Sequence, residues 1–242
     1  MADPLVLHIP HTGLELPASY LGDILVPADV LRLNVSNDAD LYVDQLFEGG
    51  GVVSLTPRFS RYVCDVERFR DESKEKESRR GRGLFYTHFE DGRQFRKNND
   101  QVRDRVLNEL YDPHHARFTE EVKNKLQAYG TCWIIDCHSF TDKTGYPDFC
   151  LGTDTFHTPA ALLTRLQSVI EQSGYKVQVD FPYNGSIVPM EYYQQDSRVQ
   201  TIMIEVNKRL YLNEATFQKK SKFKEIRKMC QEIVALVAAR DT

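Results

Sequence analysis

Apolar positions along the chain form short runs that alternate with helically spaced faces. Short strand-like runs occupy residues 5–10, 52–56, 62–66, 132–137, 176–181 and 199–206. Helical spacing covers residues 27–47, 99–129, 158–173 and 222–239. Strands that alternate with helices predict an α/β fold, in which helices cover both faces of a mixed, mostly parallel sheet. We expect one domain over residues 1–242.

Two of the helical stretches contain breaks. Ser36, Asn37 and Asp38 interrupt the first stretch and can cap a second helix. Asp112 and Pro113 fit a cap followed by a proline at the first helical position, so residues 99–129 are predicted to form two helices. The charge run at 71–82 predicts a solvated loop, with an active-site flap as the alternative.

Composition and charge limit the classes of binding partner and the cellular location that we expect. A net charge of −4 gives no chain-wide attraction to nucleic acid or to an anionic membrane. No apolar run approaches the roughly 20 residues that span a bilayer. The first residues have no signal-peptide pattern, so we expect a cytoplasmic protein. The five cysteines form no CxxC pair, which favours reduced, buried thiols.

Three polar residues fall where apolar strands are predicted to end: His11, His138 and Glu205. Ligands of open α/β sheets bind outside the carboxyl ends of the strands, so these residues are candidates for hydrolase chemistry. Each one taken alone also fits a hydrogen-bonded structural role. The HExxH, Walker A and GxSxG motifs are absent, which argues against zincins, P-loop NTPases and serine esterases.

Eight short sequence blocks follow one another between about residue 5 and about residue 217. They are HIPHTG, DADLYVDQLF, SRYVCDVERFRDE, GRGLFYT, YDPHHARFT, IIDCHSF, GTDTFHTP and IEVNKRLYLNEAT. The chain resembles the N-formylglutamate amidohydrolases, in which these blocks recur in the same order. The resemblance implies the fold of zinc carboxypeptidases, with about eight strands in the sheet. It also implies hydrolysis of N-formyl-L-glutamate to formate and glutamate, a late step of histidine breakdown.

The resemblance implies a zinc site. It makes His11 and His138 ligands and points to Asp40 for the carboxylate, with Asp38 as the fallback. Two imidazoles and one carboxylate suit Zn²⁺ and leave a fourth position for water. Asp136, two residues before His138, is expected on the same side of its strand in a structural or supporting role.

The same resemblance assigns catalytic roles. Glu205 corresponds to the general base, which takes a proton from the attacking water and returns it to the leaving amine. Arg61 and Arg68 are candidates for holding the charge that develops in the reaction. For either arginine, an ion pair with Asp65 or Glu67 is the open alternative.

N-formylglutamate carries two carboxylates, and arginine binds carboxylates with two parallel hydrogen bonds. The predicted substrate-binding residues are Arg61, Arg68, Arg82, Arg117, Asn207 and Arg209. One departure concerns Glu67, because some family members carry asparagine where this chain is acidic. An acidic group there repels a dicarboxylate unless it is paired.

Other readings therefore stay open. One is a hydrolase of a different N-acyl amino acid or of a small peptide on the same fold. Another is a non-catalytic protein that binds an acidic metabolite. The sequence leaves the native metal and the oligomeric state undecided.

Overall fold

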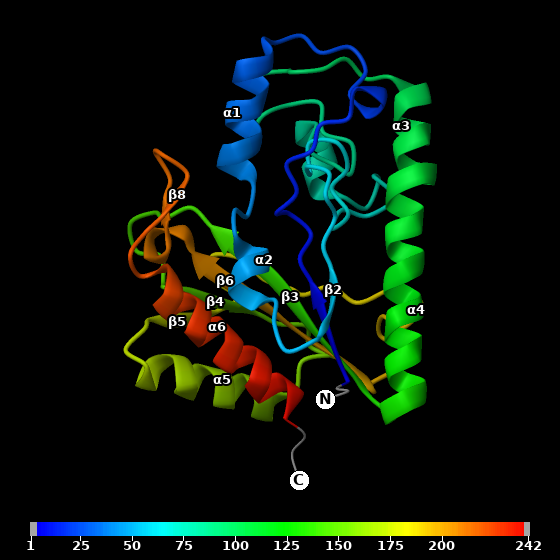
Figure 1. Cartoon of the computed structure of the whole chain (residues 1–242). Coiled ribbons are helices and arrows are strands. Elements are labelled where there is room, and N and C mark those ends of the chain that lie inside the picture. Colours follow the sequence, from blue (N-terminus) through cyan, green and yellow to red (C-terminus); the bar gives the residue numbers. More distant parts are fainter. Residues whose placement is uncertain (1–3, 240–242) are drawn as a thin grey trace. The chain divides into compact units, whose positions relative to one another are not determined.

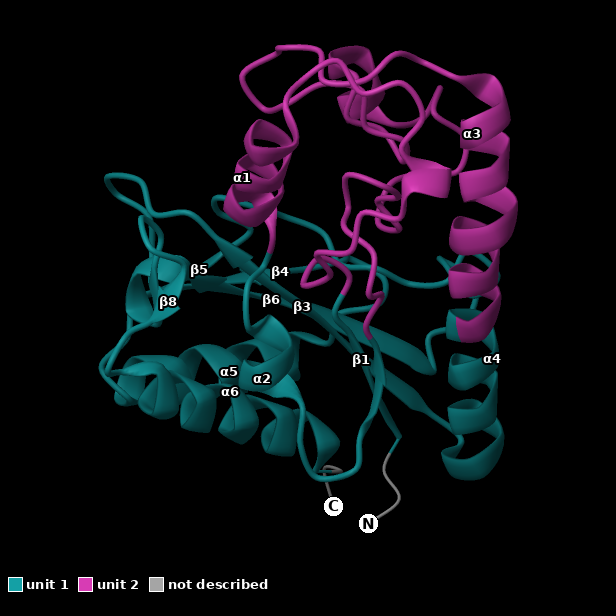
Figure 2. Cartoon of the chain, turned by 45° about the horizontal axis from the view of Figure 1, so that its top comes forward, with its two compact units in different colours: residues 1–9, 40–55, 118–242 teal, residues 10–39, 56–117 magenta. Residues whose placement is uncertain are grey.

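The computed structural model describes residues 4–239 (Figure 1), which form two compact units (Figure 2). Within these residues, unit 1 comprises 4–9, 40–55 and 118–239, and unit 2 comprises 10–39 and 56–117. The chain therefore passes from one unit to the other four times. Each unit is described by itself below.

Unit 1 is built on a six-stranded sheet with the order β2-β1-β3-β6-β4-β5. Its strands are β1 (Leu5–His8), β2 (Val53–Leu55), β3 (Cys132–Phe140), β4 (Phe149–Gly152), β5 (Val177–Val179) and β6 (Val199–Asn207). All neighbours are parallel except β4 and β6. The predicted mixed, mostly parallel sheet is confirmed, but its strands number six rather than about eight. The short strands β7 (Leu212–Asn213) and β8 (Gln218–Lys219) pair separately.

Helices cover both faces of this sheet (Figure 1). The part of α4 (Asp112–Tyr129) that belongs to unit 1 packs Phe118 and Val122 against Val6 and Ile134. The other face is covered by α2 (Val43–Phe47), α5 (Ala160–Gln172) and α6 (Phe223–Ala238). Burial on both faces explains the continuous apolar runs of β3 and β6. The apolar face predicted for the last helix is buried in α6.

One loop of unit 1 crosses the sheet face on which α4 packs. The loop backbone at Gly185 lies very close to the β4 backbone at Gly152. A Cβ atom on Gly152 would be 2.3 Å from the Gly185 carbonyl oxygen, so this position requires glycine. Ser186 and Thr201 join their hydroxyls at 2.6 Å, and the Ile187 amide donates to Asp136 at 3.2 Å. These contacts fix residues 183–188 on the face that carries Asp136.

Unit 2 has little regular structure. It contains η1 (Ala18–Tyr20), α1 (Ala28–Asp38), η2 (Lys76–Arg80), α3 (Asp100–Val106), η3 (Leu107–Tyr111) and the first turns of α4. Isolated bridges such as Glu15 with Phe59 take the place of ladders. Two apolar clusters hold the unit together, one around Val63, Leu84 and Val106 and one around a group of aromatic rings. The charge run at 71–82 is mostly exposed and includes η2.

The predicted strand at 62–66 is wrong. These residues are buried, but they form turns in which the Tyr62 amide donates to the Ser60 hydroxyl at 3.1 Å and the Val63 amide to the Ser60 carbonyl at 2.8 Å. The serine thus competes locally with a ladder. The break between α1 and α2 falls at residues 39–42, slightly later than predicted, and Tyr42 takes a positive φ of 66°.

The helical stretch at 99–129 does not stop at Pro113. Asn99 caps α3 as an N-cap residue, accepting from the Val102 amide at 3.2 Å. The chain then widens into the π-helical turn η3, and the amide of Asp112 bonds to the Leu107 carbonyl. This wider turn accommodates a proline that cannot donate to the preceding turn. Asp112 is helical rather than a cap, and it pairs with Arg70 at 2.8 and 3.1 Å.

The five cysteines are free and buried, as predicted. Among the helices at residues 4–239, none combines the length and the apolar character needed to cross a membrane.

Candidate active site

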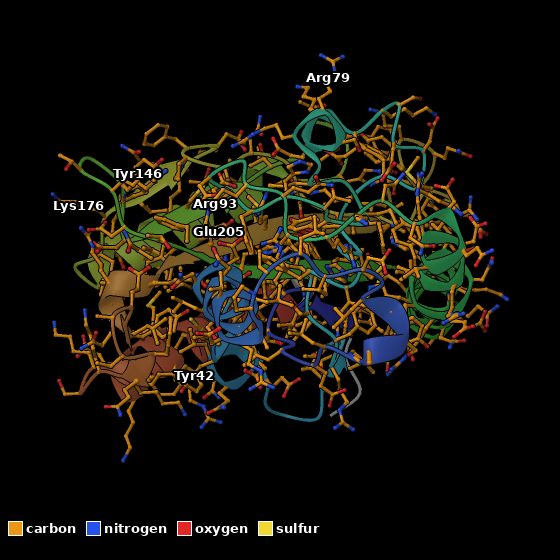
Figure 3. All side chains as sticks on the ribbon, turned by 90° about the horizontal axis from the view of Figure 1, so that it is seen from above. Tyr42, Arg79, Arg93, Tyr146, Lys176 and Glu205 are labelled. Carbon is orange, nitrogen blue, oxygen red and sulfur yellow. The ribbon has the colours of Figure 1, made fainter. Side chains whose placement is uncertain are left out.

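The two central strands of unit 1 bring His138 and Glu205 together. They are paired residues of the parallel strands β3 and β6, so both side chains leave the same face of the sheet. Both are almost completely buried, with 4% and 6% of their surface exposed. They lie two residues before the ends of their strands, close to where the sequence places them. Figure 3, a view onto this end of the sheet, shows Glu205.

A carboxylate lies at each nitrogen of the His138 ring. Nδ1 is 3.2 Å from Asp40 Oδ2, and Nε2 is 3.1 Å from Asp136 Oδ1. Asp40 directly precedes the turn into α2 and also accepts from the Ser139 hydroxyl at 2.9 Å. Unit 1 therefore brings together the predicted ligands Asp40 and His138.

Asp136 shares the side of β3 that carries His138, as predicted, and it also contacts His8. His8 is its partner in the register of β1, and His8 Nδ1 lies 2.9 Å from Asp136 Oδ1. Burial by itself raises the pKa of Asp136, but His138 and then His8 outweigh burial and hold that pKa well below its usual range. The carboxylate is therefore ionised and orients both rings. His8 stacks on Phe118 with ring centroids 5.0 Å apart.

His11 lies in unit 2, in a cluster centred on Asp65. His11 Nε2 is 2.9 Å from Asp65 Oδ1 and 3.7 Å from a Glu67 carboxylate oxygen. Asp65 is fully buried and also accepts from the Tyr86 hydroxyl at 2.6 Å. Burial raises the pKa of Asp65, yet Arg61, His11 and Arg68 together lower it well below the ordinary value.

The same cluster contains three of the predicted substrate-binding arginines. Arg61 donates to Asp65 Oδ2 through Nε and Nη2 at 3.2 and 2.8 Å, and Arg68 Nε lies 3.5 Å from the same oxygen. The ion pair left open by the sequence is therefore present for both. Arg82 donates to Asp38 at 3.1 Å and lies over the Tyr86 ring at 4.5 Å. Asp38, the fallback ligand, also accepts from Tyr62 in this unit, at 2.8 Å.

The remaining predicted substrate residues lie elsewhere. Arg117 is exposed on α4. In unit 1, the buried Asn207 amide nitrogen donates to Asp142 and to the Pro147 carbonyl at 2.8 and 2.9 Å. Arg209 pairs with Asp148 at 2.7 Å and with Asp142 at 3.4 Å. Both residues take part in a network that ties the ends of β3 and β6 to the following loops.

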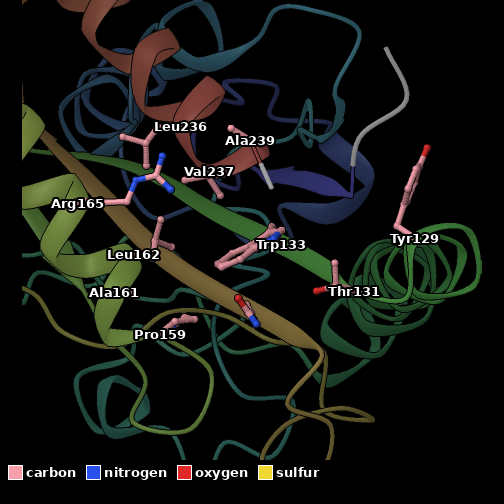
Figure 4. A pocket seen from close by; sticks show the side chains of 11 residues that line it. Tyr129, Thr131, Trp133, Pro159, Ala161, Leu162, Arg165, Leu236, Val237 and Ala239 are labelled. Carbon is pink, nitrogen blue, oxygen red and sulfur yellow. The ribbon is translucent and has the colours of Figure 1, made fainter. Parts of the chain in front are cut away.

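A pocket of about 390 Å³ lies at the opposite end of the sheet (Figure 4). Trp133 and Gln200, the second residues of β3 and β6, line it with Leu162, Arg165 and Val237 from α5 and α6. His138 is five residues further along β3 than Trp133, a separation of roughly 16 Å at the rise of a strand. The pocket is therefore separate from the paired His138 and Glu205.

Comparison with known proteins identifies the family. The model of the N-formylglutamate amidohydrolase family matches residues 3–212. The chain belongs to the N-formylglutamate amidohydrolase family. Membership supports an amidohydrolase activity on N-formylglutamate.

Solved structures agree on the fold. A crystal structure of N-formylglutamate amidohydrolase from Ralstonia eutropha JMP134 is 23% identical, with a TM-score of 0.86 over 98% of this chain and 93% of that chain. An Agrobacterium tumefaciens gene product is 18% identical, with a TM-score of 0.63 over 96% and 90% of the two chains. No curated protein matches the sequence.

The residues present fit a metal ion. A neutral imidazole carries one N–H and one nitrogen with a lone pair. Because a carboxylate lies at each nitrogen of His138, one of the two carboxylates would face that lone pair. A second proton or a metal cation removes this conflict, and zinc takes imidazole and carboxylate ligands. Side chains of the described residues that could ligate a metal ion are His8, Asp136 and His138 in unit 1 and His11 and Glu67 in unit 2. From the sequence, Glu67 was expected to pair with Arg61 or Arg68 or to face the substrate, and its contact with His11 was not predicted.

Proposed function

We propose that this family member is a zinc-dependent hydrolase that cleaves N-formyl-L-glutamate into formate and L-glutamate. The observation that carries the proposal is the register of β3 and β6, which pairs His138 with Glu205 on one buried face of the sheet. A metal ligand and a general base on adjacent strands are elements that metal-assisted hydrolysis of an amide uses. A place in histidine breakdown belongs to the proposal through the family resemblance, and a cytoplasmic location stays an expectation from the sequence.

The proposed zinc ligands are His11, Asp40 and His138. When bound, zinc supplies a Lewis acid that polarises a carbonyl group and activates water. In unit 1, Asp136 holds the His138 ring by its Nε2 atom, and a hydrogen bond of this kind sets the orientation and basicity of a ligand. Glu67 is the second candidate for the carboxylate ligand, because it lies beside His11. Comparing the zinc content of Asp40→Asn and Glu67→Gln decides between the two carboxylates.

Glu205 moves the proton. Its carboxylate accepts a proton from the attacking water and delivers it to the amine of the departing glutamate, so one group acts first as base and then as acid. The neighbouring strands hold it in place, because it is paired with His138 on one side and with Cys150 on the other. A buried carboxylate with fixed neighbours is well placed for this role.

The arginines of unit 2 bind the substrate. Arg61 and Arg68 both pair with Asp65, so two guanidinium groups lie beside one buried carboxylate, where both can bind a substrate carboxylate. Arg82 and Arg117 are further candidates in unit 2. Asn207 and Arg209 stay predictions of the family resemblance, because in unit 1 they contact Asp142 and Asp148.

Replacing Arg61 by alanine is expected to raise KM for N-formylglutamate roughly 10-fold, because a charged hydrogen bond to the substrate is lost. If Arg61 also holds the developing charge, kcat falls as well. Steady-state kinetics measure both constants. The control is Arg58→Ala, because the Arg58 side chain is 85% exposed and pairs with Glu15, which is itself half exposed. Equal KM values for the two variants would remove Arg61 from the binding site.

The proposal is tested by measuring zinc content and formate release. Purified protein is loaded with zinc, the excess is removed, and metal is counted by elemental analysis. Formate is then followed with N-formyl-L-glutamate and, in parallel, with the N-acetyl and N-succinyl analogues. We expect stoichiometric zinc and release of formate. Turnover of another analogue without formate release would keep the chemistry and change the substrate. Tight ligand binding without zinc or turnover would support a non-catalytic binding protein instead.

A further inference from the structure

Four aromatic rings gather at the carboxyl end of β3 in unit 1. The Phe140 ring is 5.8 Å from Tyr146 and 6.1 Å from Tyr183, and the Tyr146 ring is 5.6 Å from Phe181. Phe140 is buried, whereas Phe181 and Tyr183 each expose 47% of their surface. We call these four residues the aromatic platform. Exposed aromatic residues this close together are typical of a binding surface rather than of ordinary protein surface.

The platform adjoins the proposed catalytic residues. Phe140 follows His138 by two residues in β3, so both side chains leave the same face of the sheet. Glu205 is paired with Cys150, whose thiol donates to the Tyr183 carbonyl at 3.1 Å. Burial raises the pKa of Cys150 to about 11, so this donor keeps its proton at neutral pH. This hydrogen bond holds the Tyr183 backbone next to Cys150, the β4 residue that is paired with Glu205. Figure 3 shows Tyr146 and Glu205 at this end of the sheet.

The four arginines Arg61, Arg68, Arg82 and Arg209 already pair with protein carboxylates. Arg61 and Arg68 share Asp65, and Arg82 is shared by Asp38 and Glu90. In unit 1, two aspartates neutralise Arg209 close to the platform. In unit 1, an apolar group of the substrate finds aromatic faces on which to pack.

We infer that the aromatic platform binds an aromatic or bulky apolar group of a substrate, so that this chain also hydrolyses N-acyl amino acids that carry such a group, and hydrolyses them faster than matched substrates without it. The inference rests on the proposed function, because it takes the site to be an amide hydrolase. The apolar group can belong to the amino acid side chain or to the acyl part. Either source offers the same flat, apolar surface to Tyr146, Phe181 and Tyr183.

The first measurement compares kcat/KM for four substrates. N-formylphenylalanine places an aromatic group on the side chain, and N-benzoylglycine places one on the acyl part. N-formylglycine has neither, and N-formylglutamate has a second carboxylate. We expect one of the aromatic substrates to exceed N-formylglycine by roughly 10-fold or more, the range of discrimination that apolar pockets give. The preferred one identifies which part of the substrate packs on the platform.

The second measurement uses variants of the platform. Tyr183→Ala keeps the backbone carbonyl that Cys150 contacts, and Tyr146→Ala removes the ring between Phe140 and Phe181. Each is expected to raise KM for the preferred aromatic substrate roughly 10-fold, a larger change than that of KM for N-formylglycine. Phe156→Ala is the matched control, because this ring is 45% exposed in the same unit but contacts His157 rather than the platform.

Two results would overturn the inference. One is an equal kcat/KM for aromatic substrates and N-formylglycine, and the other is an equal effect of Tyr183→Ala and Phe156→Ala. Calorimetric binding of N-formylphenylalanine to the wild type and to Tyr183→Ala separates this failure from failure of the proposed function. Weaker binding to the variant with no hydrolysis of any amide would keep the platform and reject the enzyme. Hydrolysis of N-formylglutamate alone would do the reverse.

Discussion

Replacing Glu205 by glutamine is expected to slow turnover by roughly 100-fold or more while zinc stays bound. Glutamine has the same shape as glutamate, so the pairing of β3 with β6 and the position of His138 are kept. The amide cannot accept a proton from water, however, and the step that needs a base loses it. Because the carboxylate acts during the reaction rather than in binding, KM is expected to change little.

The measurement combines steady-state kinetics with metal analysis of the same preparation. Glu171→Gln on α5 is the control for the change of charge, because Glu171 is exposed. Loss of zinc together with activity would show that Glu205 belongs to the metal site instead. An unchanged rate would show that another group is the base.

The parts of the fold with strong periodicity could be predicted from the sequence. The strands β3 and β6 and the helix α6 lie within one to three residues of their predicted limits, because long apolar runs and a single apolar helix face are clear signals. Residues 62–66 have the same apolar character, but a serine two residues before them turns the chain, and burial in an aromatic cluster replaces pairing. Before Pro113, a π-helical turn lets the helical stretch continue past the proline, and residue propensities do not reveal such a turn.

The candidate site was predictable only in part. Strand ends and family blocks indicated His138, Asp40 and Glu205, and the structure places the first two 3.2 Å apart and pairs His138 with Glu205. The central role of Asp65 was not evident, because its partners His11, Arg61 and Tyr86 are brought to it by turns that carry no periodic signal. The contact between His8 and Asp136 likewise depends on the register of β1 with β3, which the sequence does not encode locally.

Replacing His138 by alanine is expected to remove zinc and activity together. Outer contacts of a metal site typically change metal affinity by about 10- to 100-fold, and removal of a direct ligand should exceed that range. The change also leaves Asp40 and Asp136 without the ring that separates them. Two buried carboxylates then repel each other, so the zinc-free variant should also be less stable.

Three controls separate loss of the ligand from loss of the fold. His157→Ala removes another buried histidine of unit 1, which bonds the Val199 carbonyl at 2.7 Å and accepts from the Gln194 amide at 2.8 Å, and it should lower stability but keep zinc. His8→Asn weakens the support of Asp136 and should give an intermediate loss of affinity. Added imidazole should restore part of the zinc binding and activity of His138→Ala, because the deleted ring is then supplied from solution. A variant His138→Ala that retains stoichiometric zinc would exclude His138 as a ligand, whatever its activity.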